Sequence, residues 1–96
     1  MSKFVFIYHG AWEYNQETMD GWTAWFATIA DHVIDSGNPF GPGREVTKSG
    51  VSEMTADTPP AAGYSIVSAD DMDAAVKLLD GCPIIHSVRV YEAMSM

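Results

Sequence analysis

The chain has little cysteine, few basic residues and no long apolar run, and each shortage excludes a class of protein. Its single cysteine, Cys82, can form no internal disulfide, which fits a reducing compartment, and we expect the protein in the cytoplasm. The apolar stretch at residues 4–8 is too short for the core of a signal peptide. No stretch approaches the roughly 20 apolar residues that a spanning helix needs, so no membrane insertion is expected.

The shortage of basic residues excludes partners that carry many phosphates. Five Lys and Arg stand against 13 Asp and Glu, which gives a formal net charge of −8. Proteins that bind nucleic acid or anionic membrane surfaces use a clustered basic patch. The basic residues are instead scattered along the chain, as Lys3, Arg44, Lys48, Lys77 and Arg89. We therefore expect neither nucleic acid nor membrane as a partner.

The length and the hydrophobic pattern predict one α+β domain over residues 1–96. Apolar runs and alternation indicate strands, and apolar residues at spacings of three and four indicate helices. Asn15 or Thr18 is a candidate cap for the first helix, and Ser68 with Asp71 for the second. The predicted order is a strand at 3–9, a helix at 15–36, strands at 44–51 and 63–68, a helix at 68–81 and a strand at 86–92.

This β-α-β-β-α-β order is the ferredoxin-like pattern. Two helices cover only one face of such a four-stranded sheet. The strand at 3–9 carries apolar side chains on both faces, so the second face also needs cover. Pairing two sheets face to face would provide that cover, and we expect a homodimer.

The stretch "GNPFGPGR" at residues 37–44 has the glycine content of a phosphate-binding loop, but it lacks the context. Phosphate loops precede helices, whereas Gly37 and Pro39 follow the predicted first helix and are placed to end it. The two prolines also remove N–H donors. We therefore interpret the stretch as a turn that binds no phosphate.

Four motifs together resemble one known family. They are "FVFIYHG" at the start, "DSGNPFGPG" after the first helix, "GYSIVSADDMDAAVKLLDGCP" in the second half and "VRVYEAM" near the end. The series is similar to that of the YCII-related (DGPF-type) proteins. The resemblance implies a dimeric α+β barrel of two ferredoxin-like subunits with a pocket in each subunit. It implies no particular reaction.

Part of the family carries a proposed catalytic pair, a His early in the first helix and an Asp near its end. By this resemblance Asp35 matches the Asp, but Thr23 stands near the position of the His. The pair is incomplete in this chain, so the resemblance does not imply that Asp35 is catalytic.

Candidate site residues follow from the expected sheet. We expect the first and third strands to be parallel neighbours and the fourth to be antiparallel to the first, so that one rim gathers His9, His86, Ser68 and Asp70. Arg44, at the start of the expected second strand, joins them. His9, His86 and Asp70 are then candidate catalytic residues, because histidine titrates near neutral pH. Ser68 and Arg44 are candidate ligand-binding residues.

Two aromatic residues after the first strand complete this candidate site. Trp12 and Tyr14 lie in the predicted loop next to His9 and could form apolar walls. His9, His86 and Asp70 would make three metal ligands, but no short ligand motif supports a metal site. We expect neither a metal nor a cofactor. A nucleophile formed by Cys82 with His86 is also not favoured.

The sequence leaves two functions open. The favoured one is a small-molecule binding or accessory protein, and the alternative is a small enzyme with His9 or His86 as general acid/base. A pocket lined by apolar groups would favour binding. A histidine hydrogen-bonded to a carboxylate inside the pocket would favour catalysis.

Overall fold

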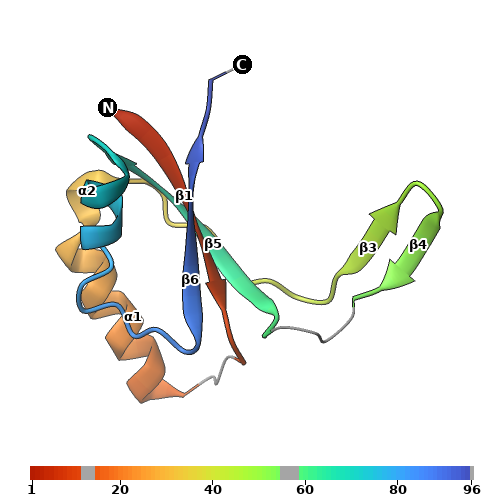
Figure 1. The fold of residues 1–96 in the computed structure, drawn as a ribbon. Helices are drawn as coiled ribbons and strands as arrows, with labels where there is room; N and C mark the ends of the chain where they lie inside the picture. Colours follow the sequence, from red (N-terminus) through yellow and green to blue (C-terminus); the bar gives the residue numbers. More distant parts are fainter. Residues whose placement is uncertain (12–14, 55–58, 96) are drawn as a thin grey trace.

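The computed structural model describes residues 1–11, 15–54 and 59–95 (Figure 1). Strands β1 (Ser2–His9), β2 (Val33–Asp35), β5 (Ala61–Ala69) and β6 (Ser87–Ala93) form an antiparallel sheet in the order β2-β5-β1-β6. Strands β3 (Arg44–Thr47) and β4 (Gly50–Glu53) form a separate two-stranded hairpin. With helices α1 (Gln16–Thr28) and α2 (Met72–Lys77), the chain has an α+β fold.

Side-chain caps start both helices. The Asn15 side-chain oxygen accepts a hydrogen bond from the Thr18 backbone N–H at 2.8 Å, so the predicted Asn15 cap is confirmed. The Asp71 carboxylate accepts one from the Ala74 N–H at 2.8 Å and caps α2. The prediction that Ser68 caps this helix is wrong, because Ser68 lies inside β5.

The second strand of the sheet is not where the sequence predicts it. Helix α1 ends at Thr28, a 3₁₀ turn η1 follows at Ala30–His32, and the chain then extends as β2. The predicted helix at 15–36 is therefore too long. Two adjacent β-branched residues, Val33 and Ile34, favour extended backbone at this point. The stretch 44–51, predicted as the second strand, belongs to the β3–β4 hairpin outside the sheet.

Strand directions also differ from the expected ones. Strand β1 runs antiparallel to β5, with Ser2 opposite Ala69 and His9 opposite Ala61. It runs antiparallel to β6 as well, with His9 opposite Ser87. The expectation of parallel first and third strands is therefore wrong, which changes the residues that meet at each end of the sheet.

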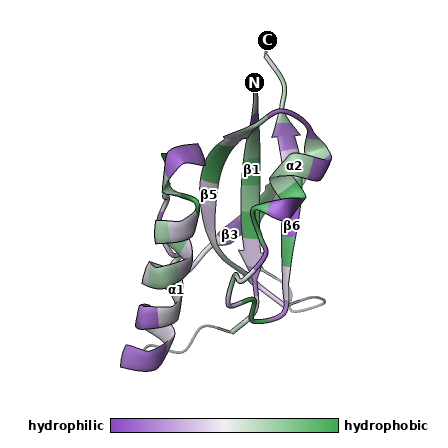
Figure 2. Ribbon diagram, turned by 90° about the vertical axis from the view of Figure 1, so that its left-hand side faces the viewer, coloured by the Kyte–Doolittle hydropathy of each residue, from purple (hydrophilic) through white to green (hydrophobic). Residues whose placement is uncertain are grey.

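The core lies between the sheet and the two helices, which cover the same face (Figures 1 and 2). Trp25 joins both helices, since its indole N–H donates to the Leu78 carbonyl after α2 at 2.9 Å. The buried apolar residues are Phe4, Phe6 and Tyr8 of β1, Trp22 and Trp25 of α1, Ile29, Val67 and Ala69 of β5, and Ala75 of α2.

The other face of the sheet, the open face, carries the alternate side chains. Val5, Ile7, Tyr64 and Ile66 of this face are half-buried, and Tyr91 is exposed. Both helices lie on the opposite side (Figure 1). Among the described residues, no helix is long and apolar enough to cross a membrane.

Candidate functional site

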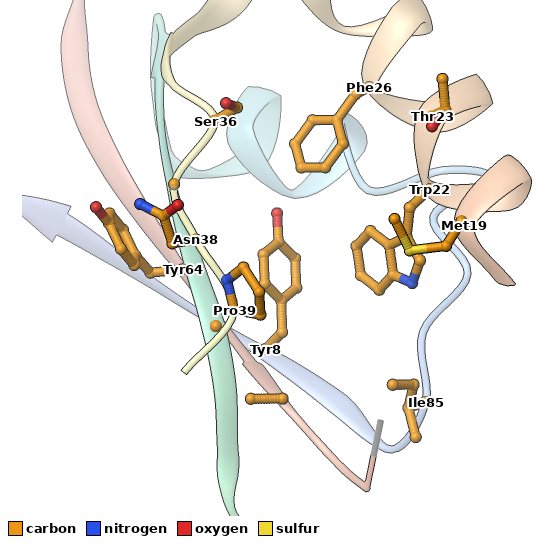
Figure 3. Close-up of a pocket in the computed structure, with 13 residues that line it drawn as sticks. Tyr8, Met19, Trp22, Thr23, Phe26, Ser36, Asn38, Pro39, Tyr64 and Ile85 are labelled. Carbon is orange, nitrogen blue, oxygen red and sulfur yellow. The ribbon is translucent and has the colours of Figure 1, made fainter. Parts of the chain in front are cut away.

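A pocket of about 410 Å³ lies between α1, the start of β5 and residues 36–40, here called the edge segment (Figure 3). The side chains of Tyr8, Trp22 and Phe26 point into it. The lining residues are Tyr8, Met19, Trp22, Thr23, Phe26, Ser36, Gly37, Asn38, Pro39, Ala62, Gly63, Tyr64 and Ile85. Among the described residues, none of the candidate site residues expected from the sequence lines this pocket.

One face of α1 forms the aromatic wall. Met19, Trp22 and Phe26 recur at spacings of three and four, which places them on the same side of the helix. The Trp22 ring meets Tyr8 edge to face, with centroids 5.0 Å apart, and lies 6.1 Å from Phe26. These rings fix the shape of the wall by packing against one another.

The edge segment forms the opposite wall. It runs along β5 as an extension of β2: the Phe40 N–H donates to the Ala62 carbonyl at 2.8 Å, and the Tyr64 N–H donates to Asn38 at 3.4 Å. Pro39 forms a bridge with Gly63. The interpretation of this stretch as a turn that ends α1 is therefore wrong.

Two glycines permit this close approach. Gly37 has φ +77°, and a Cβ atom there would collide with the Tyr64 carbonyl oxygen. The Asp35 carboxylate accepts a hydrogen bond from the Gly37 N–H at 2.8 Å and fixes the bend. At Gly63, an added Cβ would lie 3.0 Å from the Asn38 carbonyl oxygen. Larger residues would push the wall away from the sheet.

A short hydrogen-bond chain joins the pocket floor to the edge segment. The Tyr8 hydroxyl donates to the Ser65 hydroxyl at 2.9 Å, which donates to the Ser36 carbonyl at 2.7 Å. Burial raises the pKa of Tyr8 above its ordinary value, although the Ser65 hydrogen bond acts in the opposite direction. The phenol therefore stays neutral at physiological pH.

The described residues that line the pocket include no Asp, Glu, Lys, Arg or His. This is notable in a chain of net charge −8. The polar side chains of Thr23, Ser36 and Asn38 belong to exposed residues, whereas Tyr8 and Trp22 are buried. The pocket therefore has an apolar interior with polar groups toward solvent, which suits an uncharged molecule.

The two predicted histidines are neighbours but lie outside this pocket. The backbone N–H of His86 donates to the backbone carbonyl of His9 at 3.2 Å, so the predicted proximity of the two residues is confirmed. The His9 ring bonds the Pro59 carbonyl at 3.0 Å through Nδ1. By the alternation of β1, His9 belongs to the open face, away from Tyr8. Within the described part of the chain, the ring partners are the Pro59 carbonyl for His9 and the Ser87 hydroxyl for His86, and neither is a carboxylate.

The other predicted rim residues lie elsewhere. Ser68 pairs with Lys3, roughly 20 Å along β1 from His9, and Asp70 follows at the same distant end. The reason is the antiparallel β1–β5 pairing. Arg44 begins the hairpin strand β3, outside the sheet. The predicted gathering of Ser68 and Asp70 beside the histidines is therefore wrong, and the prediction that Arg44 starts a strand of this sheet is also wrong.

Three further predicted residues relate differently to the pocket. Trp12 and Tyr14 lie outside the described residues. Thr23, which stands where part of the resembled family has a histidine, lines the pocket, and Asp35 adjoins its wall through Gly37. The pocket extends from Ile85, next to His86, toward this Asp35 end.

Two other kinds of site would be a metal centre and a thiol nucleophile, and the described part of the chain supports neither. No three His, Cys, Asp or Glu side chains there are grouped so that they could hold a metal ion. Burial raises the pKa of the Cys82 thiol to about 12, so it is protonated at neutral pH and a poor nucleophile.

Comparison with models of known protein families and with curated proteins gave no match.

Proposed function

We propose that this protein binds a small, uncharged and mainly apolar molecule in the pocket between α1 and the edge segment, as a homodimer. The observation that carries the proposal is the composition of the pocket. Three aromatic side chains surround a space of about 410 Å³, and none of the described lining residues is charged. This size is within the range of pockets that hold small molecules.

The same composition favours binding over acid–base catalysis. A general acid or base must titrate near the working pH and reach the substrate. Tyr8 and Tyr64 are the titratable groups among the described lining residues, and burial raises the pKa of Tyr8. His9 and His86 do not line the pocket. An enzyme that uses either histidine would have to act outside it.

The fold proposed for the subunit is the ferredoxin-like fold of the YCII-related proteins. Counting β2 as the second strand and β5 as the third, the order β2-β5-β1-β6 reads 2-3-1-4, which agrees with that fold. The β3–β4 hairpin is then an insertion between the second and third strands. The motif resemblance over most of the chain supports the same assignment.

The homodimer is proposed because the open face is incompletely buried. Val5, Ile7 and Ile66 lie side by side on neighbouring strands, where Val5 pairs with Ile66. Such a patch is covered at low cost by the same patch of a second subunit in two-fold symmetry. The proposed assembly has two sheets packed face to face, with the helices outside.

Three probes that share the indole ring but differ in the charge of the group at C3 test the ligand class: indole, indole-3-acetate and tryptamine. Calorimetric titration is expected to give saturable binding of indole, with the anion and the cation at least tenfold weaker. Thr23→Trp should block the pocket entrance and abolish binding. Ala24→Trp, at an exposed neighbouring position that does not line the pocket, should bind indole normally. Charged probes that bind as tightly as indole, or indole binding unchanged in Thr23→Trp, would contradict the proposal.

A further inference from the structure

The β3–β4 hairpin projects from the sheet on the side opposite the helices (Figure 1). Its strands pair from Arg44 with Glu53 to Thr47 with Gly50, and every residue of both strands is exposed. Val46 and Val51 face each other across the ladder, yet they are 73% and 68% exposed. The hairpin therefore presents a pair of apolar side chains to solvent.

A hairpin of this kind has little intrinsic stability. Two isolated strands are marginally stable in water, and a third strand or a packed surface is usually required. The radius of gyration of the chain is 14.6 Å. A compact domain of this length would have about 12.5 Å. The chain is thus more extended than a domain that packs all its elements on one core.

The distribution of charge indicates what kind of partner fits. Four of the five basic residues lie in the hairpin, as Arg44 and Lys48, or on the open face, as Lys3 and Arg89. Among the described acidic residues, the same surfaces carry Asp35, Glu45 and Glu53. In a chain of net charge −8, this side of the molecule is close to electrically balanced. Two copies can therefore approach through it without strong repulsion.

We propose that the hairpin is an arm that packs on a second copy of this chain, with Val46 and Val51 against the partner. The inference rests on the proposed homodimer. When two open faces meet in two-fold symmetry, an arm that projects beyond its own open face extends toward the other subunit. Each subunit then holds its partner twice, through the sheet face and through the arm. The valine pair loses its exposure, and the hairpin gains the packed surface that it lacks in one chain.

The test compares two sets of exposed valines in the full-length protein. Sedimentation velocity over a dilution series is expected to show that Val46→Thr with Val51→Thr raises the dimer dissociation constant at least tenfold. Threonine keeps the β-branched shape, so the hairpin can still form. Val76→Thr on α2, where Val76 is 48% exposed on the helix side, is the matched control and should leave the constant unchanged.

Hydrogen exchange of the hairpin amides gives a second measurement. Protection is expected to increase with protein concentration in the wild type and to be lost in the double variant. Equal dissociation constants for the double variant and the control, with hairpin exchange independent of concentration, would overturn the arm and leave the sheet-face dimer standing. A wild-type protein that stays monomeric at all concentrations would overturn both. Indole binding to the pocket is measured separately and is unaffected by either result.

Discussion

The two faces of the four-stranded sheet differ in what covers them. Phe6 and Ile7 are neighbours in β1, yet Phe6 is fully buried beneath the helices and Ile7 is half-buried on the open face. The sequence is apolar at both positions. The difference lies in what covers them: Phe6 belongs to the core beneath the helices, whereas both described helices lie on the side opposite the open face that carries Ile7 (Figure 1).

The comparison shows that packing within one chain accounts for the apolar residues of one face of the sheet but not for those of the other. The helix-covered face closes with aromatic side chains that contact one another, such as Phe6 with Trp25 at 6.5 Å. The open face has apolar side chains of similar size but no second layer among the described residues. The proposed homodimer would supply that second layer, and variants on the two faces separate packing within one chain from packing between chains.

The largest effect is expected at the covered face. Phe6→Ala should lower the free energy of unfolding by about 3–5 kcal/mol, because it leaves a cavity in a packed core. The measurement is urea unfolding at a protein concentration low enough for the chains to be monomeric. Ile7→Ala is the matched variant on the open face and should cost less than half as much under these conditions. Equal losses at the two positions would mean that both faces are packed within one chain.

The next effect concerns the pocket wall on the covered face. Gly37→Ala should lower stability by at least about 1 kcal/mol, because alanine disfavours the positive φ and its Cβ meets the Tyr64 carbonyl. Gly41 has open space around its Cα and no unusual φ, so Gly41→Ala is the control and should be nearly neutral. Thermal unfolding of both variants, with indole titration, is the measurement. A Gly37→Ala protein as stable as the control would show that the edge segment does not hold the sheet closely.

A smaller effect is expected at the pocket floor. Tyr8→Phe removes the hydrogen bond to Ser65 and should cost about 1 kcal/mol at neutral pH. Because burial raises the pKa of Tyr8 in the folded state, the folded phenol keeps its proton above pH 10 while the unfolded one loses it. Wild-type stability should therefore fall as the pH rises above about 10. The Cys82 thiol, with its pKa raised to about 12, contributes in the same direction above about pH 9.

The pH dependence separates the two groups. Stability measured by urea unfolding between pH 8 and pH 11 should decline less steeply in Tyr8→Phe than in the wild type, and Cys82→Ala should also flatten the decline. If the Tyr8→Phe profile runs parallel to that of the wild type, the phenol is not buried as the structure indicates.

The sequence predicted the elements whose signals are local. The apolar run at residues 3–9, the buried strand around Val67 and the alternation in the last strand all correspond to strands of the sheet. The Asn15 cap could be predicted for the same reason, because the capping side chain and the Thr18 N–H that it binds are only three residues apart in the sequence. The second strand was not predicted, because Ile29 and Val33 continue the helical spacing of α1 and conceal the point where the helix ends.

The candidate site depended on information that the sequence does not carry locally. The expected rim required the direction of the third strand, and one wrong direction moved Ser68 and Asp70 to the opposite end of β1. The pocket was missed because its wall is formed by pairing between Pro39 and Gly63, which are far apart in sequence. One signal was available: Gly63 and Ser65 are small residues at alternate positions of a buried strand, which indicates that another segment approaches closely there.

The central claim is that the open face is covered by a second copy of this chain. Light scattering coupled to gel filtration of the wild-type protein tests it most directly, because the result does not depend on any variant folding correctly. At micromolar concentration the account predicts a molar mass of about twice the 10.5 kDa of one chain. A mass equal to one chain over the whole concentration range would contradict the account and leave the apolar open face unexplained.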